Sequence, residues 1–146
     1  MRCRPESPAA GQDAPHISLG RAGEDRAARH LNGLGYAILA RNWRHRRLEL
    51  DIVCRDGDVI VFVEVKTRST GRWGGPAPAV TPAKQRHILR AAQAWLKEHD
   101  LWQAPCRCDV LCLVGDDENT FSVEHFRNAF DFSAALDSRN APWQPW

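Results

Sequence analysis

Two carboxylates and one lysine stand near the middle of this 146-residue chain, at Asp51 and within the run Glu64-Val65-Lys66. Mg²⁺ prefers oxygen ligands, and proteins bind it through one or two carboxylates together with waters and substrate phosphate. A lysine beside the ion can orient a water molecule or offset the charge that develops during phosphodiester hydrolysis. These residue types therefore predict a site for that reaction, with Asp51 and Glu64 as ligands of Mg²⁺ (or Mn²⁺) and Lys66 as a catalytic residue.

The two carboxylates can meet only if the strands that carry them pair in a suitable register. Residues 48–55 and 59–67 read as strands, and Asp56-Gly57 between them is a strong signal for a two-residue hairpin turn. This turn places Asp51 opposite Phe62, on the same face as Glu64 and about 7–8 Å from it along the diagonal. A three-residue turn would shift the register by one residue and separate the two carboxylates.

The same register has a cost, because it sets Glu49 directly opposite Glu64. Like charges at opposed positions of two strands are destabilising. The strands splay apart at this point, or a cation lies between the two carboxylates. A divalent metal ion would serve, and so would Arg46 or Arg47.

Glu24 joins the set through helix periodicity. Residues 18–34 read as a helix that Ser18 caps and Gly35 ends, with an apolar stripe at Ala27, Ala28, Leu31 and Leu34. Glu24 lies four residues before Ala28 and therefore falls on that stripe. A carboxylate on a packing face needs a partner, so Glu24 is a candidate third metal ligand. The alternative is a residue near enough to the helix start to reach water and interact with the helix dipole.

The remaining elements indicate a single α/β domain with a mixed sheet and flanking helices, in the order α-β-β-β-α-β. Further strands are expected at residues 36–43, 106–114 and 120–123, and a final helical turn or two at 124–131. A second helix begins at Pro82 behind a Thr81 cap. Residues 1–16 predict a disordered tail, residues 17–131 the folded domain, and residues 132–146 a loose C-terminal tail.

Composition indicates the cellular compartment and argues against a membrane as a partner. No apolar run approaches the ~20 residues of a membrane span, and residues 1–16 lack the apolar core of a signal peptide. Five cysteines without a CxxC motif argue against a disulfide framework, and those in strands are expected to pack as small hydrophobic residues rather than bind zinc. A cytoplasmic protein without membrane contacts is therefore expected.

Charge is unevenly distributed along the chain. Residues 21–90 carry fourteen Lys or Arg and seven Asp or Glu, a net charge of +7, which leaves −5 for the rest of the chain. Such a separation suits a polyanion such as nucleic acid, although scattered arginines also keep a surface soluble. The candidate nucleic-acid contacts are Arg44, Arg46, Arg68, Arg72 and Lys84.

These motifs resemble the PD-(D/E)xK nuclease superfamily, which has the restriction-endonuclease-like fold, and within it the archaeal Holliday junction resolvases. More specifically, the chain is similar to the YraN family of bacterial proteins. The matching runs include Gly23-Glu24, Arg41-Asn42-Trp43-Arg44, Glu49-Leu50-Asp51-Ile52-Val53, Val61-Phe62-Val63-Glu64-Val65-Lys66-Thr67-Arg68 and Arg107-Cys108-Asp109-Val110. The resemblance implies metal ligands at Asp51 and Glu64, a catalytic Lys66 and a supporting Glu24. Those resolvases work as dimers, so a homodimer is a candidate assembly, although no part of the sequence indicates a dimer surface.

Three functions follow from these features as hypotheses. The first is a Mg²⁺-dependent endonuclease that cleaves DNA, including branched or otherwise structured DNA. The second is a nucleic-acid-binding module that keeps the nuclease-like fold without catalysis. The third is a protein-interaction scaffold in which arginines, Arg46 or Arg47, pair internally with Asp51 and Glu64.

Overall fold

The computed structural model describes residues 15–70 and 80–131. Its elements are α1 (Pro15–Gly33), β1 (Ala37–His45), β2 (Leu48–Asp56), β3 (Val59–Arg68), α2 (Pro82–Glu98), β4 (Cys106–Val114) and β5 (Ser122–Phe130). The strands form one sheet in the order β1-β2-β3-β4-β5, in which only β3 and β4 run parallel among the described strands. The mixed α/β architecture expected from the sequence is confirmed.

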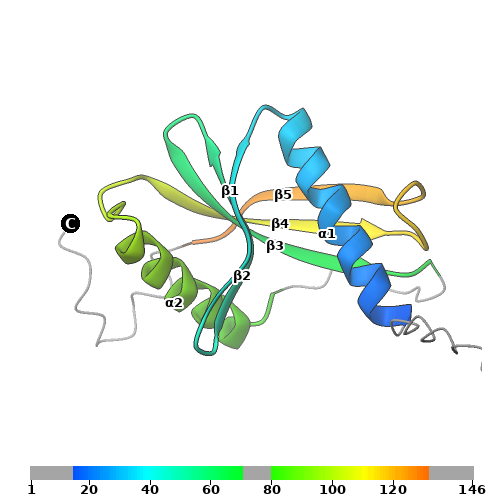
Figure 1. The fold of residues 1–146 in the computed structure, drawn as a ribbon, viewed down its shortest axis with the longest axis horizontal. Coiled ribbons are helices and arrows are strands. Elements are labelled where there is room, and N and C mark those ends of the chain that lie inside the picture. The colour runs from blue at the N-terminus through cyan, green and yellow to red at the C-terminus, as the bar shows by residue number, and fades with distance from the viewer. Residues whose placement is uncertain (1–14, 71–79, 132–146) are drawn as a thin grey trace, which may run out of the picture.

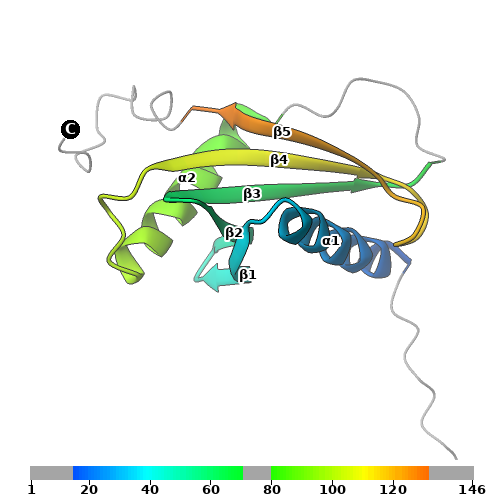
Figure 2. The same cartoon turned by 90° about the horizontal axis from the view of Figure 1, so that it is seen from above.

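The two helices cover opposite faces of the twisted sheet (Figure 1; Figure 2). Along the central strand β3, Ile60 and Phe62 pack with α2, whereas Val61 and Val63 pack with α1. Side chains alternate between the faces of a strand, so a strand covered on both sides must be apolar at nearly every position. That requirement makes the mostly buried Glu64 on the α2 side of β3 exceptional and marks the place where the site begins.

The N-terminal helix differs in one respect from its prediction. It begins at Pro15, so Ser18 lies inside it and the predicted cap at Ser18 is wrong. Proline suits the first turn of a helix, because its missing N–H would have no helical partner there. Leu34, predicted on the apolar stripe, is 43% exposed because the helix has already ended at Gly33. Within the described residues, neither helix is long and apolar enough to cross a membrane.

The prediction for the last element of the fold is wrong. Residues 124–131 were expected to form a helical turn or two, but β5 extends through Ser122–Phe130 and pairs antiparallel with β4. Without β5, the outer side of β4 would present a row of unpaired backbone N–H and C=O groups. Hydrogen bonding to β4, which local sequence does not reveal, therefore outweighs the weak helical preference of this polar segment.

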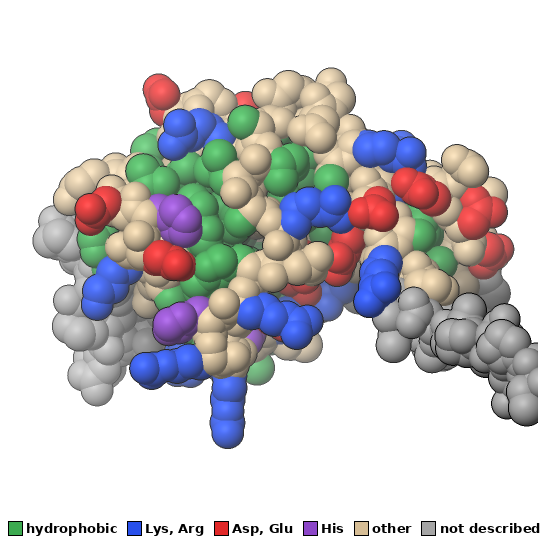
Figure 3. All heavy atoms as spheres, in the orientation of Figure 1, with side chains coloured by type: hydrophobic (Ala, Val, Ile, Leu, Met, Phe, Trp, Pro, Cys, Tyr) green, Lys and Arg blue, Asp and Glu red, His purple; other side chains and the backbone are tan. Residues whose placement is uncertain are grey.

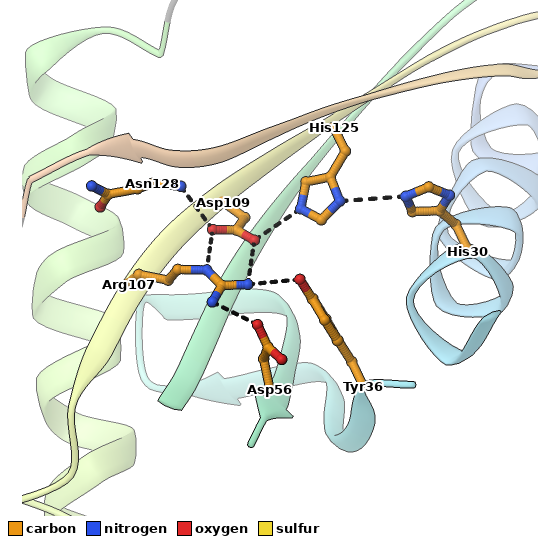
Figure 4. Close-up of polar contacts among 7 residues, drawn as sticks. All are labelled: His30, Tyr36, Asp56, Arg107, Asp109, His125 and Asn128. Atoms are coloured by element: carbon orange, nitrogen blue, oxygen red, sulfur yellow. Dashed lines mark hydrogen bonds and ion pairs between the residues drawn. The ribbon is translucent and has the colours of Figure 1, made fainter. Parts of the chain in front are cut away.

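A buried carboxylate ties β4 to its neighbours (Figure 4). Asp109 is fully buried and accepts hydrogen bonds from Arg107 Nε at 3.0 Å and from the backbone N–H of Asn128 at 3.0 Å. The same guanidinium donates to Asp56 Oδ2 at 2.8 Å and to the Tyr36 hydroxyl at 2.9 Å. The pKa of Arg107 is raised by its hydrogen bonds to the two carboxylates, although its own burial acts in the opposite direction. Asp109 is thus paired with an arginine from the start of its own strand.

Two histidines extend this network toward α1 (Figure 4). His125 Nε2 lies 2.8 Å from Asp109 Oδ2, and His125 Nδ1 lies 3.3 Å from His30 Nε2. Since an ionised carboxylate only accepts hydrogen bonds, His125 donates to Asp109 through Nε2. Burial, together with the neighbouring His125, Arg26 and Arg127, lowers the pKa of His30. The chain of contacts therefore joins β4, β5 and α1.

Gly23 sets how closely α1 approaches β3. A Cβ atom at this position would lie 2.1 Å from Thr67 Oγ1 and 2.8 Å from Thr67 Cγ2. Only glycine allows this approach, because the β-branched Thr67 side chain has few rotamers with which to move away. The close contact holds the following residue, Glu24, near the end of β3.

We expect Gly23→Ala to lower the free energy of unfolding by about 1–3 kcal/mol, because the added methyl group overpacks the contact with Thr67. Gly20→Ala is the matched control on the same helix, since a Cβ there meets no atom within 4 Å. It should gain up to about 1 kcal/mol from helix propensity. Urea denaturation of the two variants decides the point, and equal shifts in the same direction would contradict the close packing at Gly23.

Candidate active site

The β2–β3 hairpin has a different register from the one predicted. Asp56 pairs with Val59, so the turn is Gly57-Asp58 and not Asp56-Gly57. Gly57 has a φ of +58°, which suits the glycine-first position of a two-residue hairpin turn. The prediction that Asp51 lies opposite Phe62 is therefore wrong, because Phe62 pairs with Val53.

In the observed register, Asp51 and Glu64 remain on one face of the sheet and lie closer together than the predicted register placed them. The ladder ends at Ile52 and Val63, and continuing it by one position sets Asp51 opposite Glu64. The register differs from the prediction by two residues, and a shift of two returns each side chain to the same face. Beyond this point Asp51 Oδ2 accepts a hydrogen bond from the backbone N–H of Val65 at 2.8 Å. The carboxylate thus takes the place of a ladder acceptor where the regular pairing stops.

Glu49 does not face Glu64, so that prediction is wrong as well. It pairs across to β1, opposite Arg44, with 3.9 Å between Arg44 Nε and Glu49 Oε2. The repulsion that the predicted register implied does not arise. The ion pairs of Glu64 in the described part of the chain come from lysines, rather than from Arg46 or Arg47 as the scaffold hypothesis required.

Two lysines from different elements contact the same oxygen of Glu64. Lys66 Nζ lies 3.3 Å from Glu64 Oε1, and Lys84 Nζ lies 3.6 Å from it. The Glu64 side chain is 10% exposed, whereas the two lysines are each about one-third exposed. Since both ammonium groups meet Oε1, these contacts do not engage Oε2. The arrangement offsets the cost of burying one carboxylate and leaves positive charge at the surface beside it.

The position of Lys84 follows from the start of α2. Thr81 caps the helix, accepting a hydrogen bond from the backbone N–H of Lys84 at 3.2 Å, and Pro82 occupies the first turn. Both features were predicted. The buried stripe of α2, which includes Ile88, Ala92 and Trp95, then seats the helix on the face that carries Glu64. Lys84 is thereby held over β3.

Asp51 has an unusual protonation equilibrium. Its pKa is raised to about 7, first because burial removes the carboxyl from water and next because the negative charge of Glu64 lies beside it. Glu24 raises this pKa further, and the hydrogen bond from Val65 acts in the opposite direction. Perturbed pKa values of this kind cluster at functional sites, where like charges are held together.

Glu24 approaches the pair from α1 but has its own hydrogen-bond partner. Asn42 Nδ2 donates to Glu24 Oε2 at 2.9 Å, and the neighbouring Arg41 pairs with Asp25 at 2.6 Å. Within residues 15–70 and 80–131, no three side chains of His, Cys, Asp or Glu form a group that could hold a metal ion. The predicted three-ligand site with Glu24 therefore stays a prediction, and Asp51 and Glu64 are the two candidate ligands that lie together.

The predicted nucleic-acid contacts are spread over several elements. Lys84 lies at Glu64, while Arg44 and Arg46 lie at the β1–β2 hairpin, where the Arg44 side chain is 76% exposed and Arg46 has a φ of +56°. Arg68 ends β3 and is exposed. Arg72 lies outside the described residues. Figure 3 shows basic side chains projecting from the lower edge of the molecule, near the hairpin, and acidic and basic side chains intermixed over α1.

Sequence reasoning gave no role to Asn42 and did not connect Lys84 with Glu64. Asparagine is depleted in strands, so its presence within β1 was a signal that could have been used. The contact of Lys84 with Glu64 had no comparable signal, because it depends on how α2 crosses the sheet.

Comparison with known proteins gives a consistent result. The profile of "Uncharacterised protein family UPF0102" matches residues 23–113. A UPF0102 protein of Nitratidesulfovibrio vulgaris (strain DP4) is 47% identical over 92% of this chain and 98% of its own length. The similar proteins also include UPF0102 protein LI0223 of Lawsonia intracellularis, 41% identical over 88% of this chain and 96% of its own length. The chain belongs to the uncharacterised protein family UPF0102, which is the YraN family predicted from its motifs.

Proposed function

We propose that this protein is a Mg²⁺-dependent nuclease acting on DNA. The observation that carries the proposal is the adjacent pair Asp51 and Glu64, with Lys66 and Lys84 both on Glu64 Oε1. Two carboxylates held together against their mutual repulsion are a donor set that a divalent cation would neutralise. Mg²⁺ keeps several waters and needs only one or two carboxylates, so these residues fit the ion.

The residues have distinct parts in the proposed reaction. Asp51 and Glu64 would hold Mg²⁺ (or Mn²⁺), which when bound stabilises charge on a phosphate and favours formation of the attacking hydroxide. Lys66 is one-third exposed beside Glu64, where it can orient that water or offset negative charge on the phosphate. Lys84 reaches the same oxygen from the α2 side and is suited to bind a second phosphate oxygen. Glu24 supports the site from α1.

Cleavage assays test this proposal directly. The protein is incubated with Mg²⁺ or Mn²⁺ on single-stranded, duplex, flap and four-way DNA, so that the same experiment reports any preference for branched substrates. Glu64→Gln keeps the size of the side chain and removes its charge. Since a bound metal contributes several kcal/mol of transition-state stabilisation, we expect this variant to lose about a thousandfold or more in rate.

Glu118→Gln is the matched control, because Glu118 is a surface carboxylate whose ion pair with Arg29 is exposed. It should cleave like the wild type. Cleavage that persists equally in Glu64→Gln and in the control would show that the activity belongs to a contaminant or to another site.

A second candidate is a nucleic-acid-binding module without catalysis. It is favoured by the two lysines, whose ammonium groups both offset the charge of Glu64. This function predicts DNA binding that weakens linearly with log salt concentration, because phosphate contacts release counterions, and no metal-dependent cleavage. Binding that is insensitive to salt would argue against it.

A further inference from the structure

Asn42 stands out in β1 because its backbone is unusual for a strand. Its φ is +50°, in the left-handed region that few residues other than glycine adopt, although asparagine does so more readily than most. The ladder pairs Arg41 with Ile52 and Trp43 with Leu50, so Asn42 faces Asp51 across the β1–β2 pair. A strained residue that persists next to candidate catalytic groups is an observation that calls for a functional explanation.

The side chain of Asn42 reaches Glu24. Its Nδ2 donates to Glu24 Oε2 at 2.9 Å, a hydrogen bond to an ionised acceptor. The adjacent contact, Arg41 with Asp25, also ties β1 to α1. The Arg41 pair secures the helix on β1. The Asn42 contact instead holds the Glu24 carboxylate at the strand position that lies opposite Asp51.

Glu24 needs such a hydrogen-bond partner if its carboxylate is to stay in one orientation beside Asp51 and Glu64. Gly23 brings the backbone of α1 against Thr67 at the end of β3, but the Glu24 side chain retains several rotatable bonds. Fixing a glutamate side chain costs up to about 2 kcal/mol in conformational entropy. A hydrogen bond formed before the metal arrives meets part of this cost in advance.

We infer that Asn42 is a positioning residue that orients the Glu24 carboxylate toward Asp51 and Glu64, so that the negative charge of Glu24 favours a divalent cation held by those two carboxylates. The inference rests on the proposed function, because it concerns the same metal site. It assigns a purpose to the left-handed backbone of Asn42, which turns the amide toward α1 at the one position of β1 that faces Asp51.

Mn²⁺ binding to the full chain, measured by calorimetry without DNA, provides a test that does not depend on cleavage. Asn42→Gly removes the amide while keeping a residue that accepts positive φ. We expect it to weaken Mn²⁺ binding about tenfold, the lower end of the effect of removing a hydrogen-bond partner that lies outside the ligand set of a metal site. Asn128→Gly is the matched control, because Asn128 also has a φ of +50° but lies in β5 near Asp109. It should leave the affinity for Mn²⁺ unchanged.

The effect must also depend on Glu24. In a double-mutant cycle, Asn42→Gly should have no further effect on the affinity once Glu24→Ala is present. Equal Mn²⁺ affinity in wild type and Asn42→Gly, with binding lost in Glu64→Ala, would overturn this inference and leave the proposed function standing. An additive effect of Asn42→Gly in the Glu24→Ala background would overturn it too. A wild type that binds no Mn²⁺ would overturn the proposed function together with this inference.

Discussion

Asp109→Asn is expected to lower the free energy of unfolding by about 3–5 kcal/mol, the cost of removing one partner from a buried ion pair. The carboxylate is fully buried and accepts from Arg107, His125 and the backbone of Asn128. Asparagine has nearly the same shape, but it carries no charge and places an NH₂ group among donors. Among the residues that the structure describes, the Arg107 guanidinium would then keep only Asp56 as a charged partner.

Chemical denaturation of Asp109→Asn and Asp56→Asn separates the contribution of burial to stability from the contribution of charge. Both carboxylates contact the same guanidinium, but the Asp56 side chain is 36% exposed whereas that of Asp109 is 0% exposed. We expect a much smaller loss for Asp56→Asn, since water can replace an exposed partner. Comparable losses in the two variants would show that burial of Asp109 does not determine its contribution. If Asp109→Asn does not fold, Arg107→Met in the same chain should recover stability by removing the guanidinium that has lost its buried partner.

Asp51→Asn is expected to have the opposite effect on stability while abolishing the proposed metal-dependent cleavage. The pKa of Asp51 is raised to about 7 in the folded protein, against an ordinary value of 3.8. Between these two pH values the folded state holds a proton that the unfolded state has lost, so stability falls as pH rises. A tenfold change in proton affinity corresponds to about 1.4 kcal/mol. Asparagine cannot ionise, so we expect the variant to be about 2–4 kcal/mol more stable than wild type at pH 8.

The pH dependence of the stability gain in Asp51→Asn shows whether ionisation of Asp51 causes it. The difference in stability between Asp51→Asn and wild type should be small near pH 4, grow up to about pH 7 and stay constant above it. Taking the difference cancels contributions from groups such as His30, whose lowered pKa makes stability fall on acidification in both proteins. Asp58→Asn is the control, because Asp58 lies exposed in the β2–β3 turn. A gain that is independent of pH, or equal in the control, would contradict a repelled carboxylate at Asp51.

These two predictions have a common interpretation. Asp109 is a charged group whose partners are complete, so its removal is costly. Asp51 is held beside Glu64 and Glu24, whose charges oppose its ionisation. Stability given up at a site where like charges meet is typical of a functional site rather than of a structural one. Added Mg²⁺ or Mn²⁺ should accordingly stabilise the wild type and leave Asp51→Asn little changed.

Much of the fold could be predicted from local sequence. Residues 59–67 were predicted to form a strand, which is β3, and the Thr81-Pro82 pair indicated the start of α2. The common face of Asp51 and Glu64 was predicted because side-chain direction depends only on strand alternation and a two-residue turn. That conclusion survived an error in the turn itself, since Gly57-Asp58 in place of Asp56-Gly57 shifts the register by two residues.

Only the tertiary structure decided which groups meet. The contact of Lys84 with Glu64 joins residues twenty positions apart, and that of Asn42 with Glu24 joins residues eighteen apart. β5 forms because the backbone groups along the outer edge of β4 need hydrogen-bond partners. The sequence of residues 122–130 alone does not indicate this pairing. Local sequence determined the direction and type of each side chain through propensity and periodicity. The distances between carboxylates, lysines and Asn42 depend on how the helices pack across the sheet, which is a property of the whole buried core.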